Sequence, residues 1–121
     1  MKESETLDVK ALLEEAKASE HGEAYRTLDK NPNFRIGVGV RLTPPNASFF
    51  VEILIYLCPS FRNADLAVLE KSLTCLKELK TRNYALTCQD GNCVSCEATV
   101  SAANLVKEYG KAKALIKARF G

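Results

Sequence analysis

The amino-acid sequence predicts an α+β fold, a two-layer sandwich in which a four-stranded mixed sheet packs against helices. Three observations support this prediction. Residues 34–42 alternate between apolar and other side chains, residues 48–57 form an almost continuous apolar run, and two later stretches repeat apolar residues at helical spacing. The 121 residues suit one domain spanning 1–121. We expect the order α-ββα-ββα, with an acidic helix within residues 1–24, a hairpin at 34–58, a helix at 63–82, a hairpin at 84–100 and a basic helix at 101–120.

The first expected helix runs from about Glu5 to Glu20, because its apolar residues form one stripe at three- and four-residue spacing. Gly22 indicates its end, since glycine supplies the left-handed conformation that closes many helices. Residues 23–33 show no regular period and are expected to form a connecting segment. The two later helices are expected to cover one face of the sheet, so this first helix is expected on the other face or at an edge.

The first expected hairpin joins a half-buried strand to a strand that is apolar on both faces apart from Glu52. Pairing the two strands sets Gly37 and Gly39 beside Leu54 and Glu52, which leaves a shallow spot where another backbone or a ligand can approach. The two later helices cannot cover this second face, and exposed apolar patches generally mark interfaces. The candidate interaction face therefore consists of Gly37, Gly39, Phe50, Leu54 and Tyr56.

The helix at 63–82 has the clearest helical pattern in the chain, and its leucine-rich side is expected to face inward; the pattern consists of Leu66, Leu69, Leu73, Leu76 and Leu79. Asp90 and Gly91 stand between two strand-like runs, which is a strong hairpin signal. A strand, a helix and a further strand in one sheet favour parallel strands with a right-handed crossover. The sheet is therefore expected to be mixed.

The five cysteines are the one group of residues whose side chains could form a reactive or metal-binding site. A two-residue turn at Asp90 and Gly91 would place Cys88 directly opposite Cys93, close enough for a cross-strand disulfide. A zinc site is the alternative, since the spacing of Cys93 and Cys96 can chelate metal; its ligands would be Cys58, Cys88, Cys93 and Cys96. The simpler interpretation is that Cys75 and Cys96 are small buried hydrophobes without a cofactor.

Charge is distributed unevenly along the chain. Residues 1–24 carry a net charge of −4 and residues 101–121 a net charge of +4, whereas the whole chain carries only +2. A basic patch on the last helix can contact nucleic-acid phosphates or simply remain solvated. The patch consists of Lys107, Lys111, Lys113, Lys117 and Arg119. Nucleic acid is the less favoured partner, because nucleic-acid-binding domains usually have a larger basic excess.

No catalytic motif stands out. His21 is the only histidine, and Gly37 and Gly39 lie within a strand rather than in a phosphate-binding loop. The chain shows neither a secretory signal nor a membrane-spanning run, which favours a cytoplasmic protein that is not bound to a membrane. The sequence thus leans against an enzyme. It favours a small protein-interaction module that self-associates or binds another protein, with a cysteine site or nucleic-acid binding as alternatives.

Overall fold

The computed structural model describes residues 8–30, 33–56, 66–89 and 93–120, apart from the side chains of 66–69, 88, 89 and 120. The fold is α+β, as predicted. Its elements are α1 (Val9–Ala18), β1 (Glu23–Lys30), β2 (Phe34–Thr43), β3 (Asn46–Tyr56), α2 (Leu66–Thr81), β4 (Ala85–Gln89), β5 (Cys93–Val100), the 3-10 turn η1 (Ala102–Asn104) and α3 (Leu105–Phe120). The order is thus α-βββ-α-ββ-α, with one strand more than expected.

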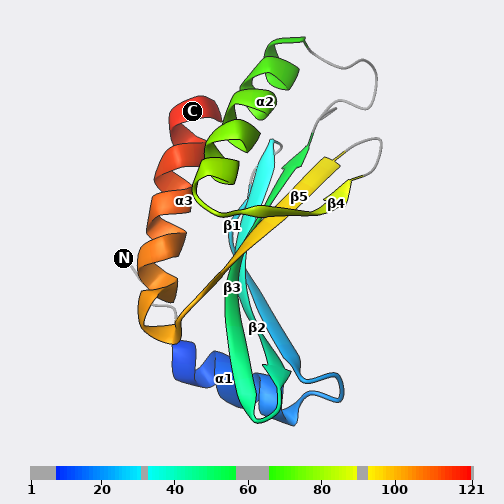
Figure 1. The fold of residues 1–121 in the computed structure, drawn as a ribbon, viewed down its shortest axis with the longest axis vertical. Coiled ribbons are helices and arrows are strands. Elements are labelled where there is room, and N and C mark those ends of the chain that lie inside the picture. Colours follow the sequence, from blue (N-terminus) through cyan, green and yellow to red (C-terminus); the bar gives the residue numbers. More distant parts are fainter. Residues whose placement is uncertain (1–7, 31–32, 57–65, 90–92, 121) are drawn as a thin grey trace.

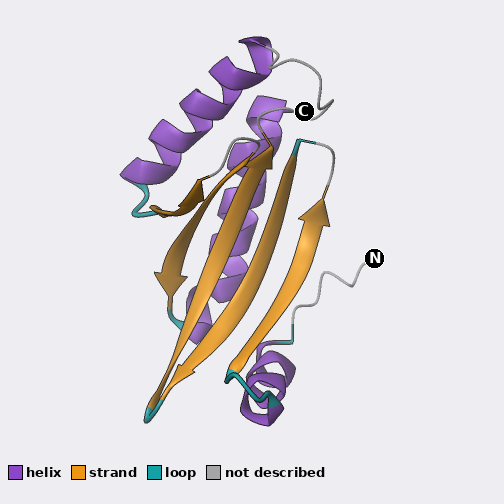
Figure 2. Ribbon diagram, turned by 90° about the vertical axis from the view of Figure 1, so that its right-hand side faces the viewer, coloured by secondary structure: helices purple, strands orange, loops and turns teal. Residues whose placement is uncertain are grey.

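The sheet has five strands in the order β1-β2-β3-β5-β4 (Figure 2). Every pairing is antiparallel, so the predicted four-stranded mixed sheet is wrong. Strands β3 and β4 do run in the same direction, because each is antiparallel to β5. The chain leaves β3, crosses over through α2 and returns as β4 one position further out, and β5 then fills the gap between them.

The additional strand, β1, lies at the sheet edge, where only one of its eight side chains, Ala24, is buried. Its pairing with β2 also shifts register between Thr27 and Asp29. An edge strand with a bulge needs neither a continuous apolar face nor a strict period of two. Residues 23–33 therefore lack the pattern by which a strand is recognised.

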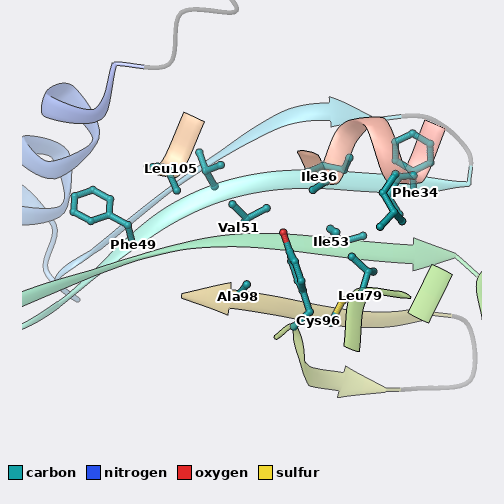
Figure 3. Packing of buried hydrophobic residues seen from close by; sticks show 14 of the residues in the cluster. Phe34, Ile36, Phe49, Val51, Ile53, Leu79, Cys96, Ala98 and Leu105 are labelled. Carbon is teal, nitrogen blue, oxygen red and sulfur yellow. The ribbon is translucent and has the colours of Figure 1, made fainter. Parts of the chain in front are cut away.

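All three helices pack on one face of the sheet (Figure 1). Helix α3 lies across β2 and β3, α2 packs beside α3, and α1 packs on β1 and β2 at one end. The core lies between the two layers and includes the aromatic and branched side chains of β2 and β3 (Figure 3). Leu12 and Ala16 of α1 belong to this same core, so the first helix does not cover the opposite face. It packs at the β1 edge, which was the other expected position.

The β2–β3 hairpin turns earlier than expected, with Thr43 paired to Asn46. Gly37 consequently lies opposite Glu52 and Gly39 opposite Phe50, two residues away from the expected partners. A shift of two residues keeps every side chain on its predicted face, because side chains alternate with a period of two. The apolar face of β2 is buried in the core as predicted.

Candidate interaction surfaces

The face of the sheet opposite the helices is covered by no helix in the described parts of the chain (Figure 2). Phe50 points to this open face and is nevertheless only 6% exposed. Two neighbours cover its ring: the Tyr25 ring stacks beside it with centroids 6.4 Å apart, and the Arg41 guanidinium carbon lies 4.1 Å above its centroid. A cation over an aromatic face is a favourable electrostatic contact. The chain therefore shields its largest apolar side chain on this face with its own residues.

The two glycines of β2 make room for these rings. A Cβ atom at Gly39 would lie 2.5 Å from Cζ of Phe50, and one at Gly37 would overlap the Tyr25 hydroxyl. The shallow spot expected between the strands is thus present in the backbone, but Tyr25 and Phe50 fill it. Sequence reasoning missed Tyr25 because its strand was not predicted.

Charged groups on the open face form a network over the rings. Arg41 donates two hydrogen bonds to Glu97, of 2.6 and 3.0 Å, and lies 3.8 Å from Glu23. The Tyr25 hydroxyl donates a 2.9 Å hydrogen bond to Glu52. Burial of this hydroxyl, together with the Glu52 carboxylate, raises the pKa of Tyr25 to about 12. A two-pronged arginine–carboxylate pair fixes geometry as well as charge, so Arg41 is held in place, and the three carboxylates leave this part of the face with an excess of negative charge.

The other end of the open face, around Arg35, differs in its charge and in its neighbours. Arg35 and Lys30 lie opposite one another on β2 and β1, and Leu54 follows across the sheet on β3. The Nε atom of Arg35 is shielded from solvent and finds no hydrogen-bond acceptor. Leu54 and Tyr56 of the predicted interaction face remain half-buried here. This end of the face therefore combines positive charge with apolar surface.

A second exposed surface lies at the β4 edge of the sheet, which is opposite the β1 edge. Helix α2 packs inward through Ser72, Cys75 and Leu79, all of them buried. Leu73 belongs to the predicted inward-facing side, yet it is 58% exposed. The prediction of the inner face of this helix is wrong in that respect. The helix is rotated so that a stripe through Leu73 and Leu76 lies at the edge, since residues three apart share one side of a helix.

The leucine stripe borders an apolar cavity of about 480 Å³ between α2, β4 and β5. Leu76 and Leu79 line it on the helix side, Cys96 on the sheet side, and Leu86 at the edge strand. Leu86 is itself 58% exposed. We refer to Leu73, Leu76, Leu86 and this cavity as the α2–β4 surface. The helical periodicity of the sequence identifies the leucines of α2, but it does not show that Leu73 remains exposed.

The predicted cysteine site does not come together in the described residues. Cys93 lies opposite Tyr56 and Cys96 opposite Ile53, and side chains that differ by an odd number of strand positions point to opposite faces. Cys88 pairs with Ser95 rather than with Cys93, which is a thiol, so the expected disulfide is not formed. The physical reason is a longer connection between the strands than a two-residue turn, because Gln89 pairs with Val94. Cys58 lies outside the described residues.

The remaining thiols are part of the core. Cys75 and Cys96 are buried as predicted. Burial raises the pKa of Cys75 to about 11 and that of Cys96 to about 12, because the thiolate is disfavoured away from water. Among the described residues, no three His, Cys, Asp or Glu side chains are grouped so that they can hold a metal ion. These two cysteines act as hydrophobic side chains.

The basic patch of α3 is partly occupied by contacts within the chain. Arg119 pairs with Glu78, and Lys117 lies 3.8 Å from Asp29. Lys113 lies 5.9 Å from the ring centroid of Tyr109. Lys107 and Lys111 line a polar cavity at the start of the helix. The five basic side chains are thus divided among different neighbours: Lys117 and Arg119 have acidic partners, whereas Lys107 and Lys111 border the same cavity.

The chain matches no protein-family model, no curated protein and no solved structure in the three comparisons. Within the described residues, no helix is both long and apolar enough to cross a membrane.

Proposed function

We propose that this protein is a non-enzymatic protein-interaction module that self-associates through its α2–β4 surface. One observation carries the proposal: Leu86, more than half exposed, lines an apolar cavity that the described residues leave open, and Leu73, equally exposed, lies one turn before Leu76 of the same lining. Burying a leucine side chain stabilises an association by roughly 1.5–3 kcal/mol. Two such residues in each copy supply a substantial part of the energy of a stable interface.

The position of this surface at a sheet edge favours a partner. Strand β4 is the last strand of the sheet in the described part of the chain, so one side of its backbone has no neighbouring strand there. Edge strands readily pair with another chain unless charge, proline or a covering element prevents it. Leu86 stands on this strand, and the leucine stripe of α2 borders the same edge. An interface here covers the apolar side chains and the strand edge together.

Charge on α2 favours a second copy of the chain as the partner. Glu70 and Lys77 are exposed, are separated by two helical turns and lie on the same side of the helix, with Leu73 between them. In an antiparallel α2–α2 contact with a two-fold axis near Leu73, Glu70 of each copy lies level with Lys77 of the other. Two-fold contacts are self-complementary in this way. The arrangement therefore provides two equivalent ion pairs around a leucine centre.

The experiment is sedimentation equilibrium of the full chain compared with Leu73→Glu and Leu86→Lys. We expect a dimer for the parent chain and a monomer for either variant, because each variant places charge in the apolar contact. The matched control is Val106→Glu on α3, where the replaced side chain is 48% exposed but lies away from the α2–β4 surface. A monomeric parent chain, or a control that dissociates equally, would contradict the proposal.

A charge exchange tests the antiparallel arrangement separately. Glu70→Lys and Lys77→Glu should each weaken self-association, because each sets like charges opposite one another. Mixing the two variants should produce a heterodimer in native mass spectrometry, since all its pairs are complementary again. If the mixture shows no preference for the heterodimer, the α2–α2 contact is not the one that holds the copies together.

A further inference from the structure

A second binding surface lies on the open face of the sheet, away from the α2–β4 surface and independent of self-association. The structure assigns this surface, centred on Arg35, to a carboxylate group of an extended acidic segment from a partner protein. The two arginines that β2 presents to the open face differ in the partners that the described residues give them.

Arg41 is fully compensated. It forms two hydrogen bonds with Glu97 and lies near Glu23, so two carboxylates surround one guanidinium. The remaining carboxylate in this region, Glu52, accepts the hydrogen bond of the Tyr25 hydroxyl. Each of these carboxylates thus has a donor or a cation beside it, with Glu97 and Glu23 sharing Arg41.

Arg35 has no such partner in the described residues. Among the described residues it forms no ion pair with a carboxylate, and its Nε donor has no acceptor. Its electrostatic contact is with the Tyr25 hydroxyl, which already donates its hydrogen bond to Glu52. The cross-strand neighbour of Arg35 is Lys30, a second cation that also forms no ion pair with a described residue. Two neighbouring cations to which no described carboxylate is paired attract an acidic ligand. A guanidinium binds a carboxylate through two parallel hydrogen bonds, which gives the contact direction as well as attraction.

The surroundings of Arg35 favour a peptide over a free anion. Leu54 lies directly opposite Arg35 on β3, and Tyr56 follows two positions further along the same face. Both are half-buried, so each presents some apolar surface beside the charge. An extended peptide places side chains at alternate positions on one side. It can therefore direct a carboxylate to Arg35 and an apolar side chain to Leu54 or Tyr56.

The test uses a fluorescein-labelled peptide of alternating glutamate and leucine residues, with its glutamine counterpart as the uncharged control. Fluorescence anisotropy measures its binding to the full chain at low salt. We expect Arg35→Ala to weaken binding about tenfold and Arg35→Lys to weaken it less, because lysine keeps the charge but not the paired hydrogen bonds. The matched control is Arg82→Ala, which removes the same charge from an exposed turn between α2 and β4.

Folding is checked in the same variants. Because no described carboxylate is paired with Arg35, Arg35→Ala should leave the urea midpoint unchanged. An equal loss of binding in Arg82→Ala would show attraction by net charge alone and overturn the proposal. Equal binding of the glutamine peptide, or no binding of either peptide, would do the same. Tighter, Arg35-dependent binding of a twelve-nucleotide single strand would assign the surface to nucleic acid instead.

Discussion

Replacing Gly39 by alanine tests how the open face is packed. The new Cβ atom would lie 2.5 Å from Cζ of Phe50 and 2.8 Å from the carbonyl oxygen of Ala24. Ordinary carbon contacts are about 3.5–4.0 Å, so at least one neighbour must move by about an ångström. The Ala24 carbonyl belongs to the backbone of β1, which pairs with β2 beside Gly39. Phe50 is held from above by Arg41 and from the side by Tyr25.

The magnitude follows from two opposing effects. Overpacking of this kind costs about 1–3 kcal/mol, whereas removing a glycine from a strand recovers about 0.5–1 kcal/mol of chain entropy. Because one of the two crowded neighbours is backbone, the overpacking cost lies in the upper part of its range, at about 2–3 kcal/mol. Less a gain of up to about 1 kcal/mol, we expect a net loss of about 1–2 kcal/mol in the free energy of unfolding. With a urea dependence of about 2 kcal/mol per molar, the unfolding midpoint falls by about 0.5–1 M.

Gly110 provides the matched control, because a Cβ atom there meets nothing within 4 Å and the residue lies within α3. Gly110→Ala should therefore raise the free energy of unfolding by about 0.5–1 kcal/mol. Urea unfolding followed by far-ultraviolet circular dichroism measures both variants. The reasoning fails if Gly39→Ala is as stable as the parent chain, or if the two substitutions change stability in the same direction.

Three further predictions concern the network and the core. Arg41→Ala should lower the free energy of unfolding, measured in urea, by about 1–3 kcal/mol, because it leaves the Glu97 side chain, which is 14% exposed, without its partner. A loss no larger than that caused by replacing an exposed arginine with alanine would contradict this. Iodoacetamide should modify Cys93 in the native protein, whereas Cys96 should react only on unfolding, because burial raises the pKa of Cys96 to about 12. Peptide mass mapping measures both reactions. Modification of Cys96 in the native protein would disprove its place in the core. The free energy of unfolding should fall as the pH rises above about 9, because burial raises the pKa of Cys96 and of Tyr84 in the folded chain. The unfolded chain then releases these protons near the ordinary thiol and phenol pKa values, while the folded chain keeps them. Urea midpoints measured between pH 8 and 10.5 check this, and a Tyr84→Phe variant should show a shallower decline.

The elements that could be predicted from sequence are those whose pattern reflects burial within the chain. Strand β2 alternates because one face lies in the core, and β3 is apolar on both sides because it is central. Strand β1 escaped prediction because an edge strand with a bulge and one buried residue has no such pattern. Strand order also could not be derived, because a crossover fixes only the relative direction of β3 and β4. The position of β5 between them depends on long-range pairing.

Candidate sites were harder to predict than elements. The open face was correctly placed opposite the two later helices, but its glycines receive Tyr25 and Phe50 instead of a ligand. The expected disulfide failed because the register of β4 and β5 depends on the connection between them, and a change in its length moves Cys88 away from Cys93. Periodicity identified the leucines of α2 without showing which of them the monomer buries. Such facts depend on how an element is rotated against its neighbours.

The rotation of α2 links these observations to function. A helix in a stable monomer normally turns its most apolar side to the core, because burial of apolar surface is the main driving force of folding. Here the inward positions are Ser72, Cys75 and Leu79, while Leu73 stands in solvent. Turning the helix to bury Leu73 would in turn move Cys75 and Leu79 away from the core. The described residues therefore leave part of the apolar surface of α2 exposed, and in the self-association proposed above a second copy would cover it.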